Sequence, residues 1–212
     1  MKPTTPRATL NHQPAATNNK AAKCDAPKKL IHSIVHGDCL EKLPKIPDNF
    51  IDFVCADFPY NISGRPGLTM RGSKVVRADF GEWDKWPSQD AYLDFVFEVC
   101  RQLHRVMKPN ASAVLFFGYR QMGWIAYELE RRGLFTYRQP IIWRKANPLP
   151  SFKQNGFRSC METGVWLVKD GGDFHRPKTF NFLGQDKMTS IWPYKIGIDG
   201  GKVSKHPTEK PL

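Results

Sequence analysis

Hydrophobic residues along the chain fall into two kinds of segment. Short runs of β-branched and aromatic residues, typical of buried strands, occupy residues 31–36, 50–56, 113–117, 137–143 and 163–168. Apolar residues at helical spacing occupy residues 40–46, the stretch that follows a capping serine at Ser88, and residues 119–132 before Gly133. Strands and helices alternate along the chain. The pattern therefore predicts an α/β fold with a mostly parallel, doubly wound sheet.

The second of these strands leads into the tetrapeptide Asp57-Phe58-Pro59-Tyr60. In an α/β sheet, ligands bind at the carboxyl ends of the strands. The tetrapeptide would then present a carboxylate, a rigid turn and an aromatic ring together at a site. Taken alone, the same residues fit a strand terminator followed by a turn equally well, so the rest of the chain has to decide between the two interpretations.

The charge of the chain indicates the class of partner. A net charge of +12 and a pI near 9.6 favour a polyanion, with nucleic acid first and an anionic membrane second. Residues 1–29 hold six basic residues against one acidic residue, and they have the composition of a disordered basic tail. The sequence has no apolar stretch near the roughly 20 residues that span a bilayer and no signal peptide, which predicts a cytoplasmic protein without a membrane partner.

The five cysteines exclude several kinds of chemistry. They are scattered, odd in number and include no Cys-x-x-Cys pair, so we expect buried thiols rather than a disulfide framework or a zinc site. None of them follows a proline, which argues against a Pro-Cys nucleophile for methylation at a cytosine ring carbon. We therefore expect neither a metal nor a covalent intermediate.

An acid-x-Pro-aromatic tetrapeptide suits one reaction well, the methylation of an exocyclic amine of a nucleobase. The lone pair of this amine is delocalised into the ring, which makes the amine a poor nucleophile. The carboxylate of Asp57 and a nearby backbone carbonyl can accept its two N–H groups and localise the lone pair toward a methyl sulfonium. Tyr60 can stack on a base that has been turned out of the duplex.

Several motifs stand in one collinear order with the tetrapeptide. They are Trp83-Asp84-Lys85, Lys108-Pro109-Asn110, Trp143-Arg144-Lys145-Ala146-Asn147-Pro148, Phe157 with Glu162-Thr163 and Trp166, and His206-Pro207-Thr208-Glu209-Lys210-Pro211. With them, residues from about 31 to 212 resemble the β-group of amino-DNA methyltransferases, and most of all the cell-cycle-regulated adenine methyltransferases of bacteria. The tetrapeptide alone is weak support. The His-Pro-Thr-Glu-Lys-Pro segment at its expected place is strong support.

The resemblance implies a Rossmann-like methyltransferase fold, S-adenosylmethionine as cofactor and N6 of adenine in double-stranded DNA as acceptor. We expect a role in restriction-modification, with an orphan or phage role as the alternatives. It assigns catalysis to Asp57, Phe58, Pro59 and Tyr60. It assigns cofactor binding to Asp38, Cys39, Asp57, His206, Thr208 and Lys210. Considered without the resemblance, Asp38 is better explained as a turn residue that closes a strand, and His206 as a surface histidine.

DNA contacts are expected from two basic segments, residues 61–87 and 144–205. The residues expected to contact DNA are Arg65, Arg71, Lys74, Arg77, Arg144, Lys145 and Asn147. A connection as long as the first segment is usually functional or disordered. Aromatic residues interleave with the charges, which suits a surface that follows phosphates and stacks on bases. For any single residue a solvated basic face is an equally good explanation, and Asn147-Pro148 is also a turn signal.

The chain departs from the family pattern in two places. Phe58 stands where the family usually has proline, so the fixed φ of proline is absent there. The Gly-rich cofactor loop, which in this family follows the His-Pro-Thr segment, is not in the sequence. We therefore expect residues 30–212 to form a C-terminally incomplete methyltransferase domain, with an exposed edge on the strand at residues 50–56.

Alternatives follow from the second departure. The chain is either an adenine methyltransferase, or a catalytically inactive DNA-binding remnant or split-enzyme half. An N4-cytosine methyltransferase of the same family is a third interpretation, although Asp rather than Ser at position 57 argues against it. The expected protein partner is either a second copy of the chain or a complementing C-terminal segment.

Overall fold

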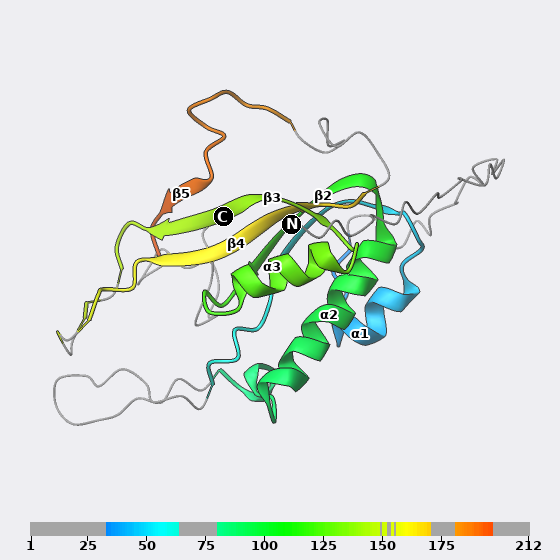
Figure 1. Ribbon diagram of the computed structural model, residues 1–212, viewed down its shortest axis with the longest axis horizontal. Coiled ribbons are helices and arrows are strands. Elements are labelled where there is room, and N and C mark those ends of the chain that lie inside the picture. Colours follow the sequence, from blue (N-terminus) through cyan, green and yellow to red (C-terminus); the bar gives the residue numbers. More distant parts are fainter. Residues whose placement is uncertain are drawn as a thin grey trace, which may run out of the picture. The chain divides into compact units, whose positions relative to one another are not determined.

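The computed structural model describes residues 33–63, 80–148, 150–151, 154, 156–170 and 181–196 (Figure 1). The expected basic tail, the basic loop residues 64–79 and the segment 197–212 lie outside these residues. The elements are α1 (Cys39–Lys42), η2 (Leu43–Lys45), β1 (Ile51–Asp57), η3 (Glu82–Asp84), α2 (Gln89–Val106), β2 (Met107–Phe117), α3 (Met122–Arg131), β3 (Thr136–Lys145), β4 (Met161–Val168) and β5 (Ile191–Tyr194). None of the described helices is long and apolar enough to cross a membrane.

The five described strands form one sheet in the order β1-β2-β4-β3-β5. β1 pairs with β2 and β3 pairs with β5 in parallel, whereas β4 is antiparallel to both β2 and β3. The expected α/β class is correct. The expectation of a mostly parallel sheet is wrong, because β4 pairs antiparallel with both of its neighbours and the sheet is mixed. The reason is the connection from β3 to β4, whose described part contains no helix, so the chain turns straight back and pairs antiparallel.

The helices of the described chain pack on one face of the sheet, so the doubly wound arrangement is not found in this part. On β2, Ala113, Leu115 and Phe117 point into the core formed with α2 and α3. The alternate residues Val114 and Phe116 point to the other face, where they pack with aromatic residues of β3, β4 and β5 rather than with a helix. Figure 1 shows α2 and α3 lying across the same side of the strands.

The helices begin and end at residues that the local sequence indicates, with one exception. The hydroxyl of Ser88 accepts the N–H of Ala91 at 3.0 Å and starts α2 where its cap predicted. Gly133 has a φ of +67° just after α3, as expected for a residue that ends a helix. The helix predicted at residues 40–46 is split into α1 and η2, because Pro44 has no N–H for an α-helical hydrogen bond.

The strand predicted at residues 31–36 is not formed where the structure describes it. Residues 33–36 have no ladder partner, and Ile34 is fully exposed. A strand exists only through a neighbour that accepts its hydrogen bonds, and β1 pairs only with β2 among the described strands. Among the described strands β1 thus lies at an edge of the sheet, and Phe53 on it is half exposed. β5, a four-residue strand containing Pro193, was not foreseen.

Candidate functional site

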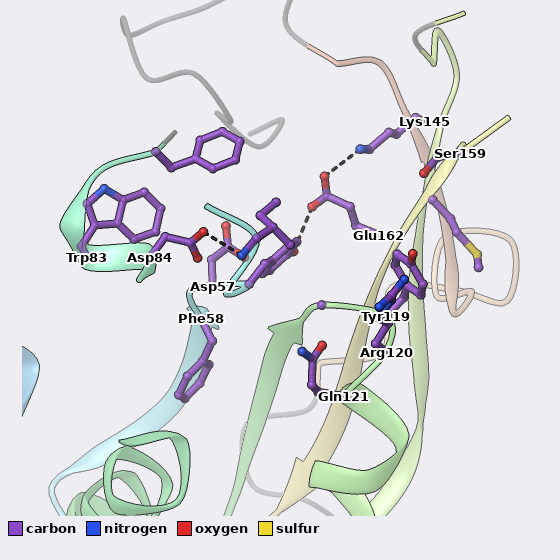
Figure 2. Close-up of a pocket in the computed structure, with 15 residues that line it drawn as sticks. Asp57, Phe58, Trp83, Asp84, Tyr119, Arg120, Gln121, Lys145, Ser159 and Glu162 are labelled. Carbon is purple, nitrogen blue, oxygen red and sulfur yellow. Dashed lines mark hydrogen bonds and ion pairs between the residues drawn. The ribbon is translucent and has the colours of Figure 1, made fainter. Parts of the chain in front are cut away.

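A pocket of about 690 Å³ opens at the carboxyl ends of β1 and β2 (Figure 2). Its wall includes three residues at the end of β1 and beyond, Asp57, Phe58 and Tyr60. Acidic and basic side chains from later elements complete it, among them Asp84, Lys145 and Glu162. The pocket lies where ligands of α/β sheets bind, so the tetrapeptide borders a pocket as well as ending a strand.

The ends of β1 and β2 approach each other closely at this pocket. Asp57 pairs with Phe116 in the parallel register, and Gly118 follows β2 directly. A Cβ atom at Gly118 would lie 2.9 Å from Oε1 of Gln121 and 3.4 Å from the backbone oxygen of Tyr60. The absence of a side chain at Gly118 thus leaves room for the Gln121 amide next to the segment that carries Tyr60.

Phe58 is held by packing where the family pattern has proline. Its N–H donates to the carbonyl of Phe116 at 3.1 Å, and its ring lies 4.7 Å from the ring of Phe117, centroid to centroid. Phe58 is only 5% exposed. Burial and a hydrogen bond to β2 thus restrict the backbone at a position where proline would restrict it covalently.

α2 contributes a side chain to the same segment. The buried Tyr92 donates its hydroxyl to the backbone carbonyl of Pro59 at 2.8 Å. Burial, followed by the charge of Asp84, raises the pKa of Tyr92, so the hydroxyl keeps its proton and remains a donor. The turn at Pro59 is therefore fixed from the helical layer as well as from the sheet.

Asp84 holds the residues that follow Tyr60. It is 1% exposed, and one of its oxygens accepts the N–H of Asn61 at 2.7 Å. The other oxygen accepts the N–H groups of Ile62 and Ser63 at 2.9 and 2.7 Å. Three backbone donors thus compensate the buried carboxylate. Sequence reasoning recognised Trp83-Asp84-Lys85 as a motif but gave this acid no role.

Tyr60 reaches a charged pair on the neighbouring strands. Its hydroxyl donates to Oε2 of Glu162 at 3.0 Å, and Nζ of Lys145 lies 2.8 Å from Oε1 of the same carboxylate (Figure 2). The pKa of Tyr60 is raised by burial first, then by the charges of Glu162 and Asp57 and by hydrogen bonds to both. The phenol is therefore a neutral donor lying between two carboxylates.

The expected cofactor residues are only partly described. Asp38 accepts the N–H of Leu40 at 2.8 Å and caps α1. The interpretation of Asp38 as a residue that closes a strand is wrong, because residues 33–36 form no strand. Cys39 is partly buried, and burial followed by the charge of Asp38 raises its pKa. Neither residue lines the pocket. Of the remaining expected cofactor residues, Asp57 lines it, whereas His206, Thr208 and Lys210 lie outside the described residues.

The residues expected to contact DNA separate into three groups. Arg65, Arg71, Lys74 and Arg77 lie outside the described residues. Arg144 is exposed on β3, whereas Lys145 turns into the pocket and pairs with Glu162. The side-chain amide of Asn147 donates to the carbonyl of Ile196 at 3.1 Å and accepts its N–H at 2.6 Å, which fixes a turn beside β5. Contact of these residues with DNA stays a prediction.

Comparison with known proteins finds a matching family and several sequence relatives of this chain. A protein-family model described as DNA methylase matches residues 51–212. The type II methyltransferase M2.LlaDCHI of Lactococcus lactis subsp. cremoris is 30% identical over 185 residues, which cover 84% of this chain and 67% of that protein. The type II methyltransferase M2.DpnII of Streptococcus pneumoniae is 28% identical over 183 residues, which cover 84% of this chain and 68% of that protein.

One solved structure supports the fold. PvuII DNA methyltransferase, described as cytosine-N4-specific, aligns with a TM-score of 0.50 over 76% of this chain and 56% of that chain. The two chains are 15% identical, so the likeness concerns the fold and not the acceptor base. The α/β fold of this chain, with its mixed sheet, therefore matches the fold of a solved methyltransferase.

Proposed function

We propose that this chain, which belongs to the N6-adenine and N4-cytosine DNA methylase family, transfers a methyl group from S-adenosylmethionine to the N6 amine of adenine in DNA. The observation that carries the proposal is the position of Asp57. Its carboxylate lies at the end of β1 in a pocket that also holds Tyr60, so an acceptor and an aromatic ring face the same space. Pockets of this size hold small molecules and nucleobases.

Two hydrogen-bond acceptors activate the amine in this proposal. Asp57 accepts one N–H of the amine, and the backbone carbonyl of Phe58 accepts the other. We choose Phe58 because the carbonyl of Pro59 is already bonded to Tyr92. The two bonds localise the nitrogen lone pair, and the carboxylate stabilises the positive charge that develops on nitrogen. After transfer, the surplus amine proton passes to Asp57 or to water.

S-adenosylmethionine supplies an electrophilic methyl group on a sulfonium. A positive centre of this kind suits a pocket whose wall carries the carboxylates of Asp57 and Glu162. Asp38 and Cys39 at the start of α1, together with His206, Thr208 and Lys210, are the proposed remaining contacts to the cofactor.

Tyr60 is proposed to stack on the target base. Its ring borders the pocket, and its hydroxyl is anchored to Glu162. Stacking on an aromatic ring compensates part of the energy that is lost when a base leaves the duplex. We also propose that Arg120, which lines the pocket, and the exposed Arg144 contact phosphates near the extruded base.

Adenine is proposed as the acceptor because position 57 is Asp rather than Ser. N4 of cytosine is the second candidate, since it is also an exocyclic amine and the same family includes enzymes that use it. The likeness to type II methyltransferases supports a restriction-modification role. The two bases are distinguished by their products, N6-methyladenine and N4-methylcytosine.

The test is methyl transfer from radiolabelled S-adenosylmethionine to unmethylated DNA, followed by mass spectrometry of the nucleosides. The parent chain should yield N6-methyladenine, and Asp57→Ala should lose transfer while retaining DNA binding. Asp94→Ala, at an exposed position on α2, is the matched control and should behave as the parent does. Only N4-methylcytosine in the digest would reassign the acceptor, and transfer by Asp57→Ala near the parent rate would remove Asp57 from the chemistry.

A DNA-binding protein without methyl transfer is the second candidate function. It is favoured by one observation, that among the expected cofactor residues within the described chain only Asp57 lines the pocket. Salt-dependent DNA binding, with no photo-cross-linking of S-adenosylmethionine and no methylated product, would support this alternative. Cross-linking that Asp57→Ala weakens would oppose it.

A further inference from the structure

Gln121, at the start of α3, is a buried residue whose side-chain amide has no partner in the described chain. The residue is 8% exposed, and its amide forms no hydrogen bond with any described residue. Every fully enclosed side-chain nitrogen or oxygen in this part of the chain does have a partner, so the Gln121 amide is not sealed in the interior. It opens on the pocket that Gln121 lines. Buried polar groups nearly always have a hydrogen-bond partner, so this amide indicates a ligand.

The amide has no task in the helix that carries it. Gln121 is the N-cap of α3, but its side chain makes no capping hydrogen bond. The backbone alone holds the residue, because its N–H donates to the carbonyl of Gly118 at 3.0 Å and its carbonyl accepts the N–H of Ile125 at 2.9 Å. Serine, threonine, aspartate and asparagine are the usual capping residues. A glutamine here is therefore better explained by what enters the pocket than by the stability of α3.

The amide lies beside the segment that carries the proposed stacking ring. A Cβ atom at Gly118 would lie 2.9 Å from Oε1 of Gln121, and 3.4 and 3.7 Å from the backbone oxygen and Cβ of Tyr60. Oε1 thus faces Gly118, and the NH2 group of the same amide lies farther from it. Figure 2 shows the amide pointing from the start of α3 toward the part of the pocket where Asp57 and Glu162 lie. A base stacked on Tyr60 would meet a hydrogen-bond donor from this side.

A donor in this place supplies a distinction that the proposed catalytic groups do not make. Asp57 and the carbonyl of Phe58 are proposed to accept an exocyclic amine, which adenine and cytosine both have. Only a purine has N7, an acceptor on the same edge as that amine, and glutamine amides pair with the N6 and N7 edge of adenine in DNA recognition. We propose that Gln121 is a specificity-determining residue whose NH2 group donates a hydrogen bond to N7 of the target adenine. This inference rests on the proposed function of the pocket.

The contact acts on the binding of the base more than on methyl transfer. N7 forms no bond to the incoming methyl group, so the hydrogen bond is equally strong in the bound substrate and in the transition state. An interaction of this kind lowers KM and leaves kcat unchanged. A base without an acceptor at this position would leave the buried NH2 group of Gln121 unpaired. The loss should therefore appear in kcat/KM, mainly through KM.

The kinetic test compares two DNA substrates of the same sequence, amplified with dATP or with 7-deaza-dATP, whose base has a C–H group in place of N7. Gln121→Met keeps the length of the side chain and removes its hydrogen bonds. On ordinary DNA it should lose about tenfold in kcat/KM, the value of one hydrogen bond. The 7-deaza substitution should then cost Gln121→Met about tenfold less than it costs the parent chain. Other adenines are replaced as well, but their effect cancels when the two proteins are compared.

Gln89→Met is the matched control, because Gln89 is exposed at the start of α2. It should retain the parent rates on both substrates. A merely structural role of Gln121 would lower the rates on both substrates alike. If the 7-deaza substitution costs the parent chain and Gln121→Met the same factor, the inference is overturned, whereas the proposed methyl transfer is unaffected.

A second measurement needs neither turnover nor the target sequence. In protein labelled with nitrogen-15 at the glutamine side chains, the Gln121 amide signal is assigned by its loss in Gln121→Met. It should move downfield on addition of 2′-deoxyadenosine 5′-monophosphate and stay near its free position with the 7-deaza analogue. A signal that the first nucleotide does not move, or that both nucleotides move alike, would overturn the inference. If the signal responds as expected and the parent chain yields no methylated DNA, the proposed transfer fails and the contact stands.

Discussion

The hydroxyl of Tyr92 and the carbonyl of Pro59 form a hydrogen bond of 2.8 Å that joins α2 to the tetrapeptide. The two residues are 33 positions apart in sequence. Tyr92 is fully buried, with its ring 5.1 Å from that of Trp86. The helical layer thus determines the position of a backbone carbonyl beside the candidate catalytic acid.

Tyr92→Phe should retain the ring packing and lose this hydrogen bond. The partly buried carbonyl of Pro59 then lacks its donor, and the free energy of unfolding should fall by about 1–2 kcal/mol. The rate of methyl transfer should fall as well, since the turn next to Asp57 gains freedom. Chemical denaturation and kcat measure the two effects.

Tyr127→Phe is the control for this change, because Tyr127 is 63% exposed on α3. It should leave both quantities as they are in the parent. Unchanged stability and rate in Tyr92→Phe would mean that the hydrogen bond contributes nothing to the site.

A methyl group at Gly118 should displace the side chain of Gln121, which lines the pocket. In Gly118→Ala the new Cβ would meet Gln121 at 2.9 Å and the backbone of Tyr60 at 3.4 Å. The side chain of Gln121 must shift, whereas the distance to the backbone of Tyr60 is an ordinary van der Waals contact. We expect only a small fall in kcat, because a side chain that lines the pocket moves while the backbone of Tyr60 keeps its place.

Gly123→Ala is the matched control, since nothing lies within 4 Å of a Cβ atom at that position in α3. Alanine is the better helix former, so this variant should gain about 0.5–1 kcal/mol in stability and keep the parent rate. Equal kinetics of the two alanine variants would show that the displacement of the Gln121 side chain does not affect the reaction.

Sequence alone identified those parts of the molecule that depend on local signals. Ser88 predicted the start of α2, and the tetrapeptide with its collinear motifs predicted membership of the N6/N4 DNA methylase family, which the family match confirms. The nearer likeness to cell-cycle-regulated adenine enzymes stays a prediction, as do the domain limits. The strand ends at Asp57 because the apolar run ends there, so the position of the candidate acid was readable as well.

The remaining parts depend on which strands become neighbours. Tyr60 and Glu162 are 102 positions apart and meet only through the mixed sheet. No spacing rule gives that distance, and the expectation of a mostly parallel sheet would have misplaced β4. The strand predicted at residues 31–36 failed for the related reason that a strand requires a partner, which the local sequence does not specify.

Asp84→Asn should loosen the segment after Tyr60. An asparagine side chain has one acceptor oxygen, whereas three backbone N–H groups converge on the two oxygens of Asp84. At least one buried donor would lose its partner, at a cost of about 1–3 kcal/mol. Hydrogen exchange at residues 61–63 should become faster, and KM for DNA should rise.

Asp186→Asn changes an exposed aspartate and supplies the control for charge alone. It should leave exchange at residues 61–63 as in the parent. Protection that persists in Asp84→Asn would mean that other contacts hold this segment.

His104 should make the stability of the protein depend on pH. The pKa of this histidine is lowered from 6.5, first by burial and then by the charge of Lys169, while Asp170 acts in the opposite direction. The folded state therefore binds fewer protons than the unfolded state between the lowered pKa and 6.5. Unfolding free energy should fall as pH drops through this window, and the loss is complete below the folded pKa.

His104→Gln should remove this contribution and flatten the dependence of the unfolding free energy on pH below about 6.5. The ring of His104 also lies 5.5 Å from that of Phe135, so some stability should be lost at every pH. Denaturation at several pH values separates the slope from the offset. His36→Gln, at an exposed position, should keep the parent slope. An unchanged slope in His104→Gln would assign the acid sensitivity to other groups.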